Sequence, residues 1–330
     1  MGDLSLLLIL VIVAALLFDF VNGWNDSANA IATVVSTRVL TPFVAVVFAA
    51  ALNFFGALVS TRVAKTIAGG IVDPNLVTGD VVLAAMLAAT LWVAVCTWWG
   101  LPISGSHSLI GGLVGAAATA LGMDVLHIGG IAKVLVALVV SPIAGFIGGY
   151  LLLVAVYWVA NSMRPKTVTR TFSVLQVLSS GFMAFTHGMN DAQKVMGVIT
   201  LALFSAGKLS SISVPLWVML LCATVMGLGT AAGGWKVIRT LGLKLAHIRP
   251  IEGFAAESAG GAVLSVAAAF GVPVSTTHTI TGSIMGVGTA FRARAVKWGL
   301  GAKIVYAWVL TLPATALLGG IAAWAIQKLF

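Results

Sequence analysis

Residues 22–33 of the chain read NGWNDSANAIAT, and residues 187–200 read HGMNDAQKVMGVIT, which repeats the same pattern in the second half. A second pair of stretches behaves alike: residues 100–115 read GLPISGSHSLIGGLVG, and residues 271–286 read GVPVSTTHTITGSIMG. A third, weaker match lies near the end of each half. Matches that recur in one order predict a duplicated chain.

The composition of this duplicated chain is that of a membrane protein. Hydrophobic residues fill 60% of the 330 positions, whereas Asp, Glu, Lys and Arg fill 8%. Soluble domains carry roughly 25% of these charged residues. So few charges exclude an ordinary soluble enzyme and a disordered protein, and two cysteines within apolar runs exclude a disulfide-stapled domain. We therefore expect an all-α integral membrane protein.

Apolar runs divide the chain into two halves. Five runs long enough to span a bilayer as helices precede a polar segment that begins NSMRPK, and five follow it. We predict a first repeat in residues 1–160, a cytoplasmic linker in residues 161–171 and a second repeat in residues 172–330. Two shorter segments, residues 28–37 and 192–205, can form further helices, which gives ten to twelve spans in total.

The distribution of basic residues predicts the orientation. If both termini lie outside and the linker lies in the cytoplasm, twelve Lys and Arg residues face the cytoplasm and five face out, as the positive-inside rule requires. With about five spans per half, an odd number, the second half begins on the opposite side of the membrane from the first. The two halves then insert in opposite senses, which is the inverted-repeat plan of secondary transporters. Polar breaks inside the runs predict broken or re-entrant helices near the midplane.

Two matched sets of polar residues have the chemistry of cation ligands. Asn25, Asp26 and Asn29 have the spacing of one face of a helical turn. Asn190 and Asp191 repeat the arrangement. A carboxylate at membrane depth costs about 2.5–3.5 kcal/mol, and hard oxygen ligands suit Na⁺ or a transferable proton. We predict that these five residues bind the coupling cation, with Na⁺ at Asp26 and Asp191. The alternative is that each Asp caps a broken helix.

Four other polar residues lie within or beside the apolar runs, and two of them have both a functional and a structural interpretation. Lys194 is either the salt-bridge partner of Asp191, which is the preferred interpretation, or a fixed positive charge for an anionic substrate. Glu257 either joins the coupling-cation path or caps its helix. We interpret Asp19 and Asn53 as packing residues.

The second repeated motif is typical of helices that begin inside the membrane. Proline favours the first turn of a helix, and Ser and Thr are strong N-caps. The free N–H groups and the positive end of such a helix suit an oxyanion. Two helix starts that face one another would form a cage of donors for a tetrahedral anion. The predicted anion-binding residues are Ser104, Gly105, Ser106, His107, Ser275, Thr276, Thr277, His278 and Lys194.

The alternative for each stretch is a re-entrant hairpin with ordinary caps. The two histidines of the motif can carry a proton or donate to an anion, although a lone histidine in a membrane is more often a packing residue. His187 has the weakest case.

These motifs resemble the signatures of the inorganic phosphate transporter (PiT) family of sodium- or proton-coupled carriers. The resemblance rests on GWNDSANAIAT, HGMNDAQKVMGVIT, the two Pro–Ser/Thr–His stretches and GFAAES near Glu257, and it spans nearly the whole chain. It implies an inverted-repeat fold, a homodimer and phosphate held where the two repeats meet. It also implies cation ligation around Asn25, Asp26, Asn190 and Asp191.

We therefore predict a secondary active transporter, not an enzyme, that imports inorganic phosphate with Na⁺ or H⁺ by alternating access. We expect a multi-pass protein of the cell (inner or plasma) membrane, with no cofactor besides the coupling ion and no nucleic-acid partner. The alternatives are a sulfate permease of the same fold, a passive anion channel and an intramembrane hydrolase. The sequence lacks the H-E-x-x-H and G-x-S-x-G motifs of common hydrolases.

Overall fold

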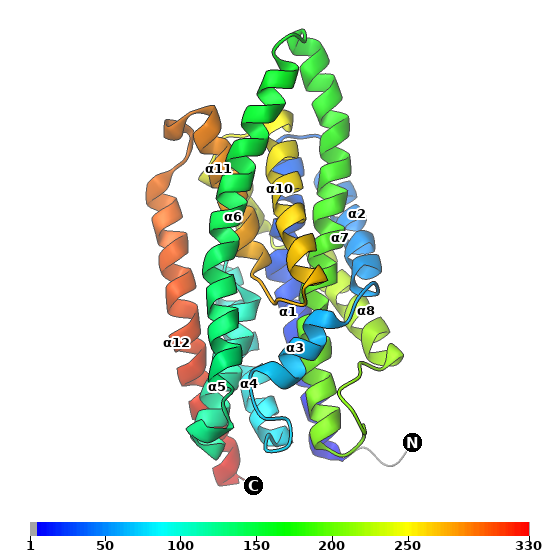
Figure 1. Ribbon diagram of the computed structural model, residues 1–330, viewed down its shortest axis with the longest axis vertical. Coiled ribbons are helices and arrows are strands. Elements are labelled where there is room, and N and C mark those ends of the chain that lie inside the picture. Colours follow the sequence, from blue (N-terminus) through cyan, green and yellow to red (C-terminus); the bar gives the residue numbers. More distant parts are fainter. Residues whose placement is uncertain (1–4, 330) are drawn as a thin grey trace.

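The computed structural model describes residues 5–329, and within them the chain is helical with no β-strand (Figure 1). This confirms the all-α prediction. The outer ends of the two predicted repeats, residues 1–4 and 330, lie outside the described residues. The first six helices are α1 (Leu6–Ser36), α2 (Pro42–Ala57), α3 (Arg62–Gly70), α4 (Gly79–Trp99), α5 (Gly105–Leu121) and α6 (Ile128–Ala160). The next six are α7 (Pro165–Ser205), α8 (Leu216–Ala232), α9 (Trp235–Arg239), α10 (Pro250–Ala269), α11 (Thr276–Phe291) and α12 (Trp298–Leu329).

Several of these helices can cross a bilayer. By length and composition, α1, α4, α6 and α12 each suffice among the described residues. Two bent pairs raise the number to six, namely α2 with α3, and α8 with α9 and the π-helical turn η2 (Thr240–Leu245) that follows it. Helices α5 and α11 have 17 and 16 residues, which is less than the roughly 20 that a full span needs. The count of ten to twelve spans stays a prediction.

Helices α1 and α7 run without a break through the first repeated motif. The segments 28–37 and 192–205 are helical, but they are not further helices: residues 28–36 are the end of α1, and residues 192–205 are the end of α7. The polar residues of the motif do not break the helix, because hydrogen bonds from neighbouring helices satisfy many of their side chains.

The polar segment between the halves is only partly a loop. Helix α6 ends at Ala160, and α7 begins at Pro165, a residue suited to the first turn of a helix. The irregular connection is therefore residues 161–164, and the rest of the predicted linker is helical. Figure 1 shows this connection at the upper end, opposite the end where α1 begins and α12 finishes.

Two helical hairpins enter the molecule from opposite ends (Figure 1). Helices α4 and α5 form the lower hairpin, and α10 and α11 form the upper hairpin. Helix α5 packs against α12, and α11 packs against α6. The two hairpins point their tips, residues 100–104 and 270–275, toward the middle. The order of elements after each tip is the same, with a helix, a short 3₁₀ turn and a long helix, which supports the duplication.

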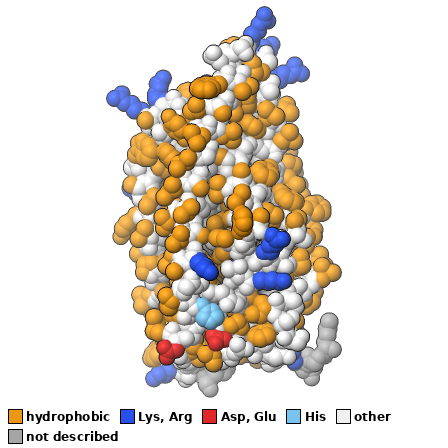
Figure 2. Space-filling view, in the orientation of Figure 1, with side chains coloured by type: hydrophobic (Ala, Val, Ile, Leu, Met, Phe, Trp, Pro, Cys, Tyr) orange, Lys and Arg blue, Asp and Glu red, His pale blue; other side chains and the backbone are white. Residues whose placement is uncertain are grey.

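The outer surface is suited to lipid. Figure 2 shows hydrophobic side chains over most of the visible face, with Lys and Arg side chains projecting at the upper end. The acidic side chains visible in this view lie near the lower end. Helices α6 and α12 present much of this apolar surface, since only 22% of an apolar 18-residue stretch in each helix is buried.

Candidate functional site

The starts of α5 and α11 lie against each other in the middle of the molecule. Each helix is capped by its own serine, because Ser104 accepts a hydrogen bond from the backbone N–H of His107 and Ser275 accepts one from that of His278, both at 3.2 Å. Ser106 Oγ donates to the carbonyl of Val274 across the contact, at 3.1 Å. Two helix N-termini, with their positive dipole ends, therefore meet at one place.

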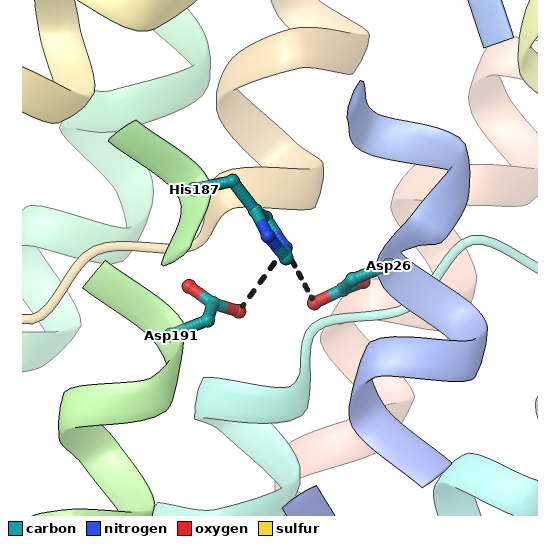
Figure 3. Close-up of side chains that lie close together, drawn as sticks. All are labelled: Asp26, His187 and Asp191. Atoms are coloured by element: carbon teal, nitrogen blue, oxygen red, sulfur yellow. Dashed lines mark ion pairs between the residues drawn. The ribbon is translucent and has the colours of Figure 1, made fainter. Parts of the chain in front are cut away.

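Two carboxylates from different halves lie near this meeting point. Asp26 comes from α1 and Asp191 from α7, and His187 lies between them (Figure 3). The Nε2 atom of His187 is 3.8 Å from Asp26 Oδ2 and 3.8 Å from Asp191 Oδ2. Side-chain ligand atoms of the three residues all lie within 4.8 Å of one another, and all three residues are buried. We call this group the acidic cluster.

The start of α11 is hydrogen-bonded directly to the acidic cluster. Thr277 Oγ1 donates to Asp26 Oδ1 at 2.8 Å, and Thr276 Oγ1 donates to Asp191 Oδ2 at 3.2 Å. Asn29 Nδ2 in turn donates to the hydroxyl oxygen of Thr277 at 3.0 Å. The residues predicted to bind the anion and those predicted to bind the cation therefore form one site.

Lys194 is the cationic member of this site. Its Nζ lies 2.7 Å from Asp191 Oδ1 and donates to the carbonyl of Val274 at 3.0 Å. The ion pair is the interpretation that the sequence favoured. The formal charges of the two carboxylates and the one ammonium sum to one negative charge.

Several buried oxygen atoms around the acidic cluster have no hydrogen-bond partner among the described residues. One is Asp26 Oδ2. The others are amide oxygens whose own nitrogens already donate hydrogen bonds, as Asn25 does to Thr97 at 2.8 Å and Asn22 does to Asp191 at 3.3 Å. Buried oxygens are normally paired, and carboxylate and carbonyl oxygens are the ligands that hard cations prefer. The amide oxygens are Asn22 Oδ1, Asn25 Oδ1, Asn29 Oδ1 and Asn190 Oδ1.

The model of a family described as the phosphate transporter family matches residues 22–319. The chain belongs to the phosphate transporter family. The resemblance inferred from the motifs is thereby confirmed, and membership places the protein among phosphate transporters rather than enzymes.

Relatives of this phosphate transporter match nearly the whole length of its chain. A protein of Bacillus subtilis is 44% identical over 100% of both chains, and one of Rhizobium meliloti is 47% identical over 97% of this chain and 96% of its own. Each is named a probable low-affinity inorganic phosphate transporter. A solved structure named the sodium-dependent phosphate transporter superimposes with a TM-score of 0.89 at 24% identity, over 98% of this chain and 100% of that chain. This likeness confirms the transporter fold.

Not every predicted site residue of the transporter joins the acidic cluster. Glu257, on α10, accepts short hydrogen bonds from Thr33 and Ser179 and a third from Gln176 at 3.3 Å. No hydrogen bond in the described chain links it to either aspartate, although Thr33 lies two turns beyond Asp26 on α1. We call these four residues the Glu257 cluster.

Asn190 is held in place by two hydrogen bonds from its amide nitrogen. Its amide nitrogen donates to the carbonyl of Thr186 at 2.8 Å and to that of Leu264, on α10, at 3.1 Å. A cation would bind the amide oxygen, and Asn190 Oδ1 has no hydrogen-bond partner among the described residues, so the role of Asn190 as a cation ligand stays a prediction.

The two motif histidines lie against each other and beside α12. Their rings lie 4.6 Å apart, and His278 stacks on Trp308 of α12 at 3.8 Å between ring centroids. Trp308 donates to the carbonyl of Pro102 at 2.9 Å. Both histidines line a cavity of about 600 Å³ whose other walls are mainly apolar side chains of α6 and α12. This arrangement agrees with the packing interpretation of His107 and His278.

Four residues matter more to the site than their sequence pattern indicates. His187 lies at its centre, and Asn53 of α2 orients it through a contact of 2.7 Å between Asn53 Oδ1 and His187 Nδ1. Asn22 aligns with His187 in the repeat, and both side chains lie near Asp191. Their matched positions in the repeat are therefore the sequence feature that could have identified both as site residues. Asp19, fully buried one turn before Asn22, has no hydrogen-bond partner at either carboxylate oxygen among the described residues.

Proposed function

We propose that the protein imports inorganic phosphate together with Na⁺ or H⁺, and that both bind at the acidic cluster and the adjoining helix starts. One observation carries this proposal: the hydroxyls of Thr276 and Thr277, at the start of α11, donate to the two carboxylates. The hydroxyl donors that a phosphate would need are thus engaged by the two carboxylates, and these are the groups that a cation would neutralise.

This arrangement supplies a coupling mechanism. When a cation binds the carboxylate oxygens, the two threonine hydroxyls are free to turn and donate to an oxyanion. The unpaired backbone N–H groups of the first helical turn then add further donors. Phosphate in turn makes the site more favourable for the cation, since linkage between two ligands is reciprocal.

The charges and oxygens of the site support the same ligands. The excess negative charge beside Lys194 matches one monovalent cation. The unpaired amide oxygens of Asn22, Asn25 and Asn29 can complete its coordination or accept a hydrogen bond from a protonated phosphate. Sulfate has no proton to donate at neutral pH, so this acceptor-rich site favours phosphate over sulfate.

Transport by alternating access, with the two repeats in opposite orientations, is part of this proposal. The opposed hairpins support it, and so does the position of the α6–α7 connection at the end opposite to where α1 begins and α12 finishes. We propose that this connection is cytoplasmic and that both ends of the chain lie outside a cell (inner or plasma) membrane. The homodimer implied by the resemblance stays a prediction.

The test is phosphate uptake by purified protein in liposomes under separately imposed Na⁺ and pH gradients. Asp26→Asn and Asp191→Asn should each abolish the response to the driving gradient, whereas Asp124→Asn, at an exposed carboxylate, should keep it. Uptake that ignores both gradients would indicate a passive anion channel. Sulfate that competes equally with labelled phosphate would indicate a sulfate permease.

A further inference from the structure

Each hairpin tip is held by a short helix from the other half of the chain. On one side, Arg62 and Thr66 of α3 contact the upper hairpin: Arg62 Nη1 donates to the carbonyl of Ala269 at 2.5 Å, and Thr66 Oγ1 donates to that of Gly271 at 2.8 Å. We call these contacts the α3 latch.

A matching pair of contacts, from Lys236 of α9 and from Thr240 at the start of η2, holds the lower hairpin. Lys236 Nζ donates to the carbonyl of Trp98 at 2.9 Å, and Thr240 Oγ1 donates to that of Gly100 at 2.9 Å. The ammonium of Lys236 also lies 4.5 Å from the centroid of the Trp98 ring. We call these contacts the α9 latch.

The two latches have the same design. In each, a basic residue and a threonine four positions later bind two carbonyls that are two positions apart. The carbonyls lie where α4 and α10 end, which is where a helix leaves carbonyls unpaired and where its dipole attracts a cation.

The glycine at each tip makes the fit close. Gly100 and Gly271 have φ values of +74° and +66°, a conformation that glycine adopts at little cost. A Cβ on Gly100 would lie 2.9 Å from the Cβ of Lys236, and one on Gly271 would lie 3.3 Å from the Cβ of Arg62. The tips therefore pack directly on the residues that hold them.

The latches are connected to the site by very short lengths of chain. Five residues after Gly100 the helix α5 begins, and five residues after Gly271 the helix α11 begins with Thr276. A hairpin tip cannot move away from the site while its latch is closed. Arg62 and Lys236 are exposed, so water can replace their hydrogen bonds at modest cost, as a reversible closure requires.

We propose that the two latches are positioning elements that close the two access routes to the site, one for each side of the membrane. The two latches hold hairpins that enter from opposite ends, so release of the α3 latch opens one side and release of the α9 latch opens the other. This inference rests on the proposed transport by alternating access, and it names the residues whose release selects the open side.

The test measures from which side a reporter cysteine is accessible. Ser106→Cys, at the contact between the tips, is placed in a protein whose buried Cys96 and Cys222 are replaced by Ala. A membrane-impermeant thiol reagent is then applied to right-side-out and to inside-out vesicles. Opening either latch removes two hydrogen bonds, so labelling from one side should rise about tenfold.

The two latch variants should act on opposite sides. Arg62→Met with Thr66→Val should raise labelling from one side only, and Lys236→Met with Thr240→Val should raise it from the opposite side only. Lys65→Met and Arg239→Met, exposed residues of the same short helices, serve as matched controls and should change neither. If a double variant fails to fold, the single variants Thr66→Val and Thr240→Val should give the same opposite shifts, smaller in size.

Three results would overturn the inference: unchanged labelling in folded variants, an increase from the same side for both latches, or an equal effect of the control variants. Failure of the proposed function would look different, because the unmodified protein would then show no gradient-driven phosphate uptake in liposomes.

Discussion

Lys194 and Asp191 lie one helical turn apart on α7 and form a buried ion pair, with Nζ 2.7 Å from Oδ1. The same ammonium donates to the carbonyl of Val274, just before the start of α11. Lys194 therefore joins the unbroken helix α7 to the upper hairpin as well as neutralising one carboxylate.

Replacing this lysine should destabilise the fold. Lys194→Met leaves the buried Asp191 without its cation, and removing one partner of a buried pair typically costs about 3–5 kcal/mol. We expect a clearly lower melting temperature in detergent. Adding Asp191→Asn should restore much of the stability without restoring uptake. A single variant that melts like the unmodified protein would assign Lys194 to substrate binding alone.

Gly105→Ala should reduce phosphate uptake through Asn22. A Cβ at Gly105 would overlap the side-chain oxygen of Asn22, whose amide nitrogen donates to Asp191. Overpacking of this kind typically costs about 1–3 kcal/mol. Gly129→Ala is the matched control, since nothing lies within 4 Å of a Cβ there. Equal uptake by the two variants would show that the position of Asn22 does not matter.

The serine caps of the two hairpin helices should contribute measurably to stability. Ser104→Ala and Ser275→Ala each remove an observed cap hydrogen bond, at a typical cost of about 1 kcal/mol. Thr41→Ala provides the control, because Thr41 occupies the N-cap of α2 without forming a side-chain cap bond. Thermal unfolding should separate the two serine variants from the threonine variant, and three equal values would contradict the assignment.

Glu257→Gln tests whether the Glu257 cluster is structural or functional. The carboxylate accepts from Thr33, Ser179 and Gln176, and an amide turns one acceptor into a donor facing these groups. A buried hydrogen-bonding group left without a matching partner typically costs about 1–3 kcal/mol, so we expect a lower melting temperature. Gln176→Leu, which removes only one of the donors, should cost less. Unchanged stability with a weaker dependence of uptake on Na⁺ would instead support the cation path.

The helix starts and the two aspartates could be predicted because their signals are local. Serine caps, prolines and a repeated Asn-Asp pair are visible within a few residues. The continuity of α1 could not be predicted in this way. Its polar residues look like a break until the partners are known, and those partners come from other helices, as with Asn25 and Thr97.

The role of His187 depends on packing between distant segments. Its partner Asn53 lies 134 residues away, and the contact exists because α2 and α7 approach closely. At Gly188 a Cβ would meet the backbone of Asn53, and at Gly56 it would meet that of Phe185. Nothing in the local sequence predicts such a pairing. The latches are equally non-local, since each joins residues of opposite halves.

The unbroken course of α1 through the site limits how its sequence can change. Successive residues of an α-helix are turned by about 100° and advanced by about 1.5 Å. One residue inserted between Asn22 and Asp26 would therefore rotate the carboxylate of Asp26 away from the face of α1 that carries Asn22. Length changes in this stretch should therefore be far more harmful than most substitutions. In the loops between helices, an added residue has no such geometric effect.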